Sequence, residues 1–267
     1  GEIMIHKWKQ LANTKDPDQI LTNLFGDKYR RYRDKWESAF GMKKVYDYPI
    51  HLDFELNFGC NLRCPQCILQ VNSVELDKNH PYYRDTEKQR ISYEKFREII
   101  DEGVEHGLCS ITVGVNNEPL MIPDVGKFIS YAREKGVVDV ILITNGTLLT
   151  EERSRQLLDS GLTKLYFSVD AIKEETYKFI RKGGNLKQVI DNINTFLRLR
   201  KEKNAVLPIT RVSFVKSKVN VAEADEFVKY WESRVEFVSI QAFMPPALGH
   251  SNYNEIREIF YIENTDL

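Results

Sequence analysis

The chain has 267 residues, of which 38 are Lys or Arg and 39 are Asp or Glu, so its formal net charge at pH 7 is -1. This balance provides no overall positive field for binding nucleic acid or acidic membranes. Hydrophobic residues make up 42% of the chain, which is enough to bury a core and excludes disorder of the whole chain. No stretch approaches the roughly 20 apolar residues of a membrane span, and no signal peptide is evident, so we expect a cytoplasmic protein.

Residues 1–45 are polar and charged, and we predict that they form an N-terminal helical extension. Ile20, Leu21 and Phe25 recur at helical spacing. The Lys and Arg residues at positions 28–35 are interleaved with acidic residues. This mixture favours a solvated helix face over a site for an anionic substrate.

Residues 46–245 alternate between short apolar segments rich in β-branched residues and longer segments with helical periodicity. This alternation predicts a parallel sheet made of right-handed βαβ units, and six such units are fewer than the eight of a closed barrel. We therefore predict an α/β fold, a partial (β/α)6 TIM-like barrel, followed by a C-terminal segment at 246–267. The expected strands span residues 50–58, 110–115, 138–144, 164–170, 209–215 and 235–243. The expected helices span residues 92–107, 123–136, 150–161, 186–203 and 221–233, with Ser92 and Thr150 as N-caps.

In barrels of this kind the chemistry lies at the carboxyl ends of the strands. The first expected strand also alternates, with Leu52 and Phe54 on one face and Asp53 and Glu55 on the other. Because helices must cover the outer face, one interpretation is that the acids point into the barrel. The other is that this strand lies at an edge and its polar face meets water.

Three of the four cysteines, Cys60, Cys64 and Cys67, fall within eight positions directly after the first expected strand. Crowded thiols in a reducing compartment indicate a metal centre. A structural zinc site would need a fourth ligand, for which His80 would have to fold back. An iron–sulfur cluster held by three thiolates would instead leave one iron open for a substrate or cofactor. Cys109 precedes another strand, and we interpret it as a packing residue.

The pattern Cys-x3-Cys-x2-Cys after a first strand resembles the signature of the radical S-adenosylmethionine (SAM) superfamily. Four further elements follow in the family's order at expected strand ends, and the resemblance covers residues 50–245. They are residues 116–120, similar to the family's Gly-Gly-Glu-Pro segment; the turn at 144–146; the strand end at 168–170; and the helix at 177–181.

The resemblance implies that Cys60, Cys64 and Cys67 hold three irons of a [4Fe-4S] cluster whose fourth iron binds SAM. It also implies a set of SAM contacts: Gln66, Asn117, Glu118, Thr144, Ser168, Arg181 and Gln241. Among them, Glu118 would accept from the SAM ammonium group, Thr144 and Ser168 would bind the ribose, and Arg181 would bind the carboxylate. Each of these residues also has a purely structural interpretation, as a surface acid, a turn cap, a helix residue or a buried amide.

Two departures from the family pattern affect this set. The residue before the third cysteine is commonly aromatic and is Gln66 here, so side-chain stacking on adenine is lost and only its backbone could make that contact. Asn116 and Asn117 stand where the family has two glycines. Asn tolerates the left-handed conformation better than most residues, so we expect the turn to survive.

The family's chemistry is reductive cleavage of SAM, which gives a 5′-deoxyadenosyl radical that abstracts hydrogen from a substrate. By resemblance we expect an oxidoreductase, isomerase or peptide-modifying enzyme that acts on a peptide or a sugar-like small molecule. Its partner would be a flavodoxin- or ferredoxin-like one-electron reductant. The expected substrate contacts are Asp53, Glu55, Arg211 and Ser213, although Arg211 is also a candidate for an ion pair holding the first and fifth strands in register. His250 and Tyr253 are candidates for closing over the barrel mouth.

Within the family, the cysteine loop and residues 208–241 look most like the branch with a SPASM or Twitch extension, which binds auxiliary clusters. No cysteine follows Cys109 in this sequence. Either the enzyme works with one cluster, or the sequence is the core of a longer protein. The alternatives from other classes are a zinc-stabilised binding module and a family member that binds SAM without turnover.

Overall fold

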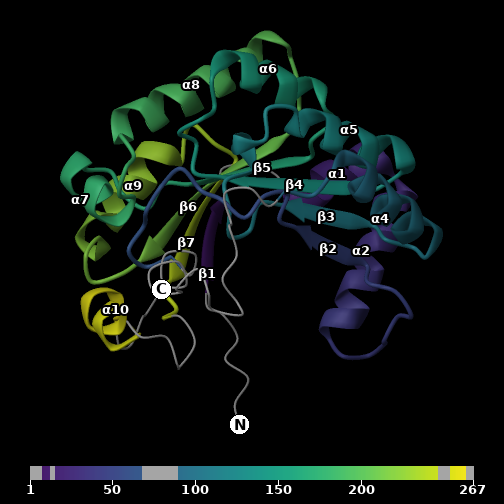
Figure 1. The fold of residues 1–267 in the computed structure, drawn as a ribbon, viewed down its shortest axis with the longest axis horizontal. Helices are drawn as coiled ribbons and strands as arrows, with labels where there is room; N and C mark the ends of the chain where they lie inside the picture. The colour runs from purple at the N-terminus through teal and green to yellow at the C-terminus, as the bar shows by residue number, and fades with distance from the viewer. Residues whose placement is uncertain (1–7, 13–15, 68–89, 246–252, 263–267) are drawn as a thin grey trace, which may run out of the picture.

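The computed structural model describes residues 8–12, 16–67, 90–245 and 253–262. Within these residues the fold is built on a seven-stranded sheet of order β1-β7-β6-β5-β4-β3-β2 (Figure 1). Strands β2 to β7 pair in parallel, and β1 pairs antiparallel with β7. The strands are β1 (Trp8–Ala12), β2 (His51–Phe54), β3 (Ser110–Val113), β4 (Asp139–Thr144), β5 (Lys164–Ser168), β6 (Ile209–Lys216) and β7 (Phe237–Ala242).

The six parallel strands are the six that the sequence predicts, in the predicted order, so the α/β partial barrel is confirmed. Strand β1 was not predicted, and it lies inside the expected N-terminal helical extension. Its short segment, WKQLA, has no decisive local period, and it becomes a strand by pairing with residues more than two hundred positions later. The expected division of the chain at residues 45 and 245 stays a prediction.

The helices follow the predicted pattern, with caps that explain where they begin and end. Ser92 accepts a hydrogen bond from the backbone N–H of Lys95, and Thr150 accepts one from Arg153. Gly136 ends its helix in the left-handed conformation, with φ of 108°. The helices are α1 (Pro17–Phe25), α2 (Asp27–Phe40), α4 (Tyr93–Glu105), α5 (Val125–Lys135), α6 (Glu151–Asp159), α7 (Glu174–Ile180), α8 (Leu186–Glu202), α9 (Ala224–Trp231) and α10 (Tyr253–Phe260). Two 3-10 turns, η1 (Pro119–Met121) and η2 (Val221–Glu223), lie between them.

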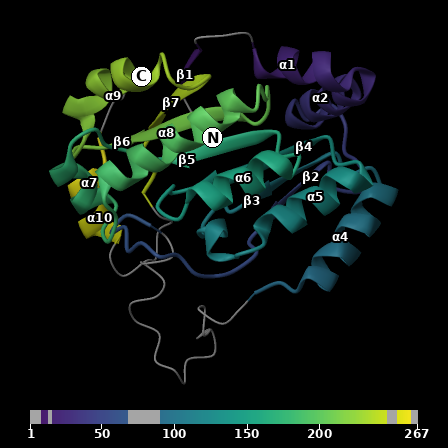
Figure 2. The same ribbon diagram turned by 90° about the horizontal axis from the view of Figure 1, so that it is seen from above.

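Helices α4, α5, α6 and α8 lie side by side over one face of the sheet (Figure 2). The strand side chains beneath them are apolar and buried, as Val113, Leu142, Phe167 and Phe214 illustrate. These residues form one continuous hydrophobic core with the inner faces of the helices. Alternation along each strand sends the other set of side chains to the opposite face of the sheet.

The opposite face, which we call the inner face, carries the polar strand residues. The strand register aligns Tyr166 with Arg211 and Ser168 with Ser213 across neighbouring strands. At the β2 edge the side chain of Asp53 is 57% exposed. The Asp53 side chain on this edge strand therefore meets water, whereas Glu55, which directly follows β2, is half-buried and accepts from the N–H of Asn116.

Helices α1 and α2 pack at the end of the barrel where the strands begin. Leu21, Tyr29 and Tyr32 form a buried cluster with Ile209 and Phe237, which are the first residues of β6 and β7. This position is on the opposite side of the molecule from α7 and α10 (Figures 1 and 2). The amino-terminal helices therefore cover the end of the barrel away from the cysteine loop.

The C-terminal helix α10 packs on the carboxyl side of the sheet. Ile256 and Phe260 form a buried cluster with Ile180 of α7 and with Phe243, which follows β7. Tyr253 is the first residue of this helix, whereas His250 lies outside the described residues. None of the described helices is long and apolar enough to cross a membrane.

Candidate metal centre and its surroundings

The three neighbouring cysteines lie on the loop that follows β2. Cys64 is buried, and Cys60 and Cys67 are half-buried. The backbone N–H of Cys67 donates to the carbonyl of Cys64 at 3.0 Å, which turns the chain between them. Burial raises the pKa of the Cys64 thiol to about 11, and the charges of Cys67 and Cys60 act in the same direction. Burial therefore favours the protonated form of the Cys64 thiol, and a bound metal ion would favour its thiolate.

Among the described residues, no group of three or more His, Cys, Asp or Glu side chains is arranged so as to hold a metal ion. His80, the predicted fourth zinc ligand, lies outside the described residues. The acid whose charge acts on Cys60 is Glu118, and both of its oxygens already accept hydrogen bonds from the protein. The three thiols are therefore not gathered around one point, but they share one loop, and no fourth ligand lies beside them among the described residues. Three soft sulfur ligands of this kind fit an iron–sulfur cluster better than a four-ligand zinc site.

The segment after β3 is fastened to the residues that precede the cysteine loop. Asn57 donates through Nδ2 to the carbonyl of Glu118 at 3.1 Å, and the N–H of Glu118 donates to the carbonyl of Gly59 at 3.1 Å. Asn117 donates in turn to the carbonyl of Asn57. These bonds fix the second loop against the first, directly beside Cys60.

The two asparagines that replace the family's glycines do not adopt the left-handed conformation that we expected them to need, because neither has a positive φ. The N–H of Asn116 instead donates to Glu55 Oε1 at 2.7 Å. The Oδ1 atom of Asn117 is buried and has no protein partner among the described residues. This acceptor is free for a ligand, which fits the prediction that Asn117 contacts SAM.

Glu118 is 1% exposed, and three donors surround its carboxylate. Thr144 Oγ1 donates at 2.7 Å, the N–H of Asn145 at 2.7 Å, and the N–H of Leu120 at 3.0 Å. Burial raises the pKa of Glu118 above its ordinary value, against the effect of these bonds. The structure therefore shows Glu118 and Thr144 binding each other, and the predicted contacts of both with SAM stay predictions.

A polar network that the sequence analysis missed joins the cysteine loop to the turn after β4. Asn145 donates through Nδ2 to Asn61 Oδ1 at 3.0 Å and approaches Cys60 Sγ at 3.7 Å. Asn61 donates to Thr147 Oγ1 at 2.8 Å, and Thr147 donates to Asn145 Oδ1 at 2.6 Å. The available signal was an Asn beside a cysteine and another inside the Thr-Asn-Gly turn, but their contact spans 84 residues.

The ends of β5 and α7 place a buried ion pair beside Cys64. Arg181 Nη2 lies 2.5 Å from Asp170 Oδ2, and their side chains are 16% and 3% exposed. Burial alone would lower the pKa of Arg181, but the Asp170 carboxylate raises it above its ordinary value, so the guanidinium stays charged. The charge of Arg181 acts in turn on the Cys64 thiol. Arg181 was predicted for this site, whereas Asp170 was not.

The remaining predicted cofactor contacts occupy the rim of the inner face. Ser168 is half-buried at the end of β5, and Gln241 is half-buried on β7, where its Nε2 donates to Ser239 Oγ at 3.3 Å. Gln66 is half-buried in the cysteine loop, and its Oε1 atom has no protein partner among the described residues. Their contacts with SAM stay predictions.

The expected substrate contacts are spread over the inner face. The Arg211 guanidinium stacks over the Tyr166 ring at 3.6 Å, and Ser213 is buried beside them on β6. Asp53 instead pairs with His51 at 3.0 Å. The predicted ion pair that would hold the first and fifth parallel strands in register is wrong, because three strands separate β2 from β6 in the sheet.

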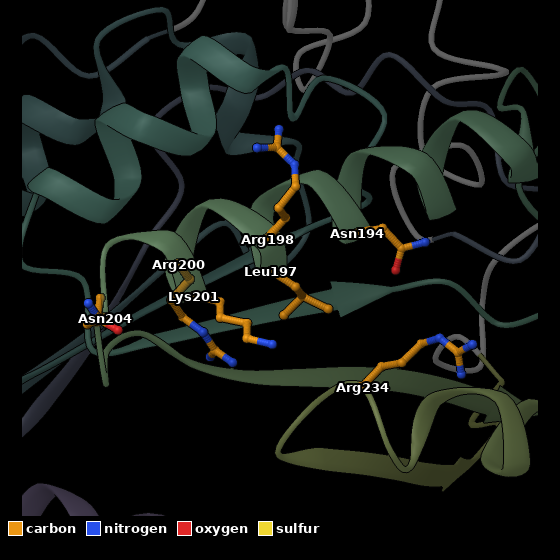
Figure 3. A pocket seen from close by; sticks show the side chains of 8 residues that line it. Asn194, Leu197, Arg198, Arg200, Lys201, Asn204 and Arg234 are labelled. Carbon is orange, nitrogen blue, oxygen red and sulfur yellow. The ribbon is translucent and has the colours of Figure 1, made fainter.

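A surface pocket of about 600 Å³ lies along α8, away from the cysteine loop (Figure 3). Two of its charged lining residues are held in ion pairs, Arg200 with Glu236 at 2.7 Å and Arg198 with Glu202 at 2.7 Å. Its lining comes from α8, from the segment that follows α8 and from Arg234, and includes no residue of the cysteine loop. This pocket therefore plays no part in the candidate site.

The fold and the site together define a class of protein: a parallel α/β partial barrel with a three-thiol loop at the carboxyl end of its first parallel strand. The comparison with known families agrees, because the model of the radical SAM superfamily matches residues 54–229. The chain belongs to the radical SAM superfamily.

Among curated proteins, the chain is similar to GTP 3′,8-cyclases. It is 31% identical over 160 residues to the enzyme of Alkaliphilus metalliredigens, a match that covers 59% of this chain and 47% of the relative. It is 30% identical over 189 residues to the enzyme of Thermodesulfovibrio yellowstonii, covering 70% of this chain and 53% of the relative. The chain thus spans about half the length of these relatives.

Among solved structures, the chain resembles Streptococcus suis SuiB bound to S-adenosylmethionine, with a TM-score of 0.55, 15% identity and coverage of 76% of this chain and 42% of SuiB. It also resembles anSMEcpe with bound AdoMet and the Cp18Cys peptide, with a TM-score of 0.54, 19% identity and coverage of 76% and 54%. At these identities the likeness shows the fold alone.

Proposed function

We propose that this chain is the core of an enzyme that cleaves SAM reductively at a [4Fe-4S] cluster held by Cys60, Cys64 and Cys67. Cys60, Cys64 and Cys67 would hold the cluster, which would supply the electron for cleaving SAM and so the means of abstracting hydrogen from a substrate. The observation that carries the proposal is the three-thiol loop, to which the loops after β3 and β4 are joined by buried and part-buried hydrogen bonds.

The residues of this chain would bind and orient the cofactor. Asn117 Oδ1 and Gln66 Oε1 offer buried acceptors without protein partners among the described residues, which suits the donor groups of SAM. The charged guanidinium of Arg181 suits a carboxylate. Glu118, through its three protein donors, would hold the loops around these groups in place.

We propose that the substrate lies on the inner face and is a peptide or a sugar-like small molecule. The side chains in reach there are polar: the stacked pair of Tyr166 and Arg211, and the hydroxyl of Ser213. GTP, which the names of the curated relatives indicate for those enzymes, carries both a sugar and anionic groups, and it is the first small molecule to test.

The electron would come from a flavodoxin- or ferredoxin-like partner. Arg63 and Lys182 are both exposed and lie together at the cysteine loop, because the N–H of Arg63 donates to the carbonyl of Lys182 at 2.8 Å. Two cations at this position suit an acidic electron carrier.

The test is anaerobic reconstitution of the protein with iron and sulfide. We expect a brown protein with about four irons per chain that binds SAM. A colourless protein that holds one zinc and has no affinity for SAM would instead support the zinc-stabilised binding module and overturn the proposal.

A further inference from the structure

We propose that Asp170 is a positioning residue that holds Arg181 in place for the carboxylate of SAM. This inference rests on the proposed function, and it concerns a side chain that the sequence analysis did not select. Asp170 follows β5 and is 2% exposed, so its carboxylate can act only on the groups packed against it.

Asp170 is held in place both through its carboxylate and through its backbone carbonyl. Its Oδ1 atom accepts from the backbone N–H of Val215 at 2.8 Å, which ties it to β6. Its carbonyl accepts from Asn220 Nδ2 at 2.8 Å. Its Oδ2 atom is then directed to Arg181 at 2.5 Å. Asp170 is thus held against β6, and the Arg181 side chain contacts it from the end of α7.

The backbone of Asp170 is also specialised, because its φ of 64° lies in the left-handed region that non-glycine residues rarely adopt. Asp and Asn are the side chains that tolerate this conformation best. A change to Asn therefore preserves the backbone preference, but it removes the charge and leaves one acceptor oxygen and one NH2 donor where Val215 N–H and Arg181 each met an acceptor oxygen.

Arg181 has no comparable anchor of its own. It follows the seven-residue helix α7, and its N–H makes the last bond of that helix to the carbonyl of Tyr177 at 2.7 Å. Its Nε atom is buried and has no partner among the described residues. With Nη2 engaged by Asp170, the Nε–H of the planar guanidinium is left as a donor for a second carboxylate.

The location points to the carboxylate of SAM as that second partner. The charge of Arg181 acts on Cys64, on Cys60 and on Glu118, so the guanidinium lies within the ring of loops around the cysteines. A cofactor bound at the open iron of a cluster on these thiols would bring its carboxylate to this ring.

A double-mutant cycle on the cluster-loaded chain tests the inference, with the dissociation constant of SAM measured by anaerobic equilibrium dialysis. Arg181→Gln should raise this constant about tenfold to a hundredfold, the usual effect of losing a hydrogen bond between charged groups. Asp170→Asn should raise it about tenfold. The double variant should bind SAM no more weakly than Arg181→Gln alone, because Asp170 acts through Arg181.

Asp139→Asn provides the matched control. Asp139 forms an equally buried ion pair with Lys164 at 2.6 Å, but at the end of the barrel away from the cysteines. Its loss should leave the SAM dissociation constant within about twofold of that of the unmodified chain, since the change is distant from the site. Equal weakening by both Asp→Asn changes would mean that Asp170 is merely structural.

The inference would also be overturned by unchanged SAM binding in Asp170→Asn, by unchanged binding in Arg181→Gln, or by multiplied effects in the double variant. If Asp170→Asn takes up no iron, Arg181→Lys is used as the test variant instead. Lys keeps the positive charge facing Asp170 but lacks the Nε donor. That variant should bind SAM about tenfold more weakly at normal iron content, and unchanged binding would contradict the inference. A cluster-loaded unmodified chain that binds no SAM would overturn the proposed function itself.

Discussion

Glu118 and Thr144 illustrate what sequence reasoning at the residue scale can and cannot provide. Both were predicted as SAM contacts from motifs that lie 26 residues apart, and the structure shows that they bind each other. The motifs identified loops that lie together in the structure, because strand ends of a parallel sheet meet at one edge. They could not reveal which polar atoms the protein satisfies internally, since that depends on contacts between loops distant in the sequence.

The Glu118 carboxylate provides the first prediction. Glu118→Gln keeps the shape of the side chain but turns one acceptor oxygen into a donor that faces a backbone or hydroxyl donor. We expect it to lower the free energy of unfolding by about 1–3 kcal/mol, measured by urea denaturation. Glu152→Gln, on the exposed surface of α6, is the control and should change it by less than about 0.5 kcal/mol. Equal effects of the two changes would contradict the central role given to Glu118.

At the scale of elements, periodicity and capping predicted the six parallel strands and the helices between them. Ser92 and Thr150 cap as predicted, because an N-cap requires only a side chain and a backbone three residues later. Strand β1 was not predicted, because this edge strand is defined by its pairing with β7 and not by the hydrophobic pattern of its own residues. Asp170 was missed for the same reason, since its partners come from β6 and α7.

The ion pair that attaches α8 to the sheet predicts how the free energy of unfolding depends on pH. Arg200 of α8 binds Glu236 through both nitrogens, at 2.9 and 2.7 Å. Burial alone would raise the pKa of Glu236, but the bonds from Arg200 and Thr210 outweigh it and hold the pKa below its ordinary value of 4.5. A lowered pKa stabilises the fold above the ordinary value, and this contribution disappears as the pH falls.

We therefore expect Glu236→Gln to lower the free energy of unfolding by about 1–3 kcal/mol at pH 7. The difference from the unmodified chain should shrink as the pH falls below 4.5, because the native carboxylate also becomes protonated at sufficiently low pH. Urea denaturation at a series of pH values measures it. Glu202→Gln, which breaks the exposed pair with Arg198, is the control and should have little effect at any pH. A pH-independent loss in Glu236→Gln would contradict the explanation.

At the scale of the whole molecule, the two ends of the barrel are built differently. Its amino end is covered by α1 and α2, which bury Leu21 and Tyr29 against the first residues of the strands. Its carboxyl end carries the cysteine loop and the polar loops joined to it. The sequence predicted the helices of the extension but not where they pack, because packing joins elements that are more than one hundred residues apart.

Two leucines of α1 test this packing. Leu21 is fully buried, whereas Leu24 is 47% exposed on the same helix. We expect Leu21→Ala to lower the free energy of unfolding by about 2–5 kcal/mol, because it leaves a cavity at the base of the barrel. Leu24→Ala should lower it by less than about 1 kcal/mol. Similar losses in urea denaturation would mean that α1 is not an integral part of the barrel.

The central claim is that the three-thiol loop supports reductive cleavage of SAM. The most direct measurement is mass-spectrometric detection of methionine and 5′-deoxyadenosine after the reconstituted protein is reduced with dithionite in the presence of SAM. We predict both products from the unmodified chain and from Cys109→Ala, whose cysteine lies apart from the loop at the start of β3, and neither product from Cys64→Ala. Equal product from Cys64→Ala, or none from an unmodified chain that holds iron and binds SAM, would contradict the account.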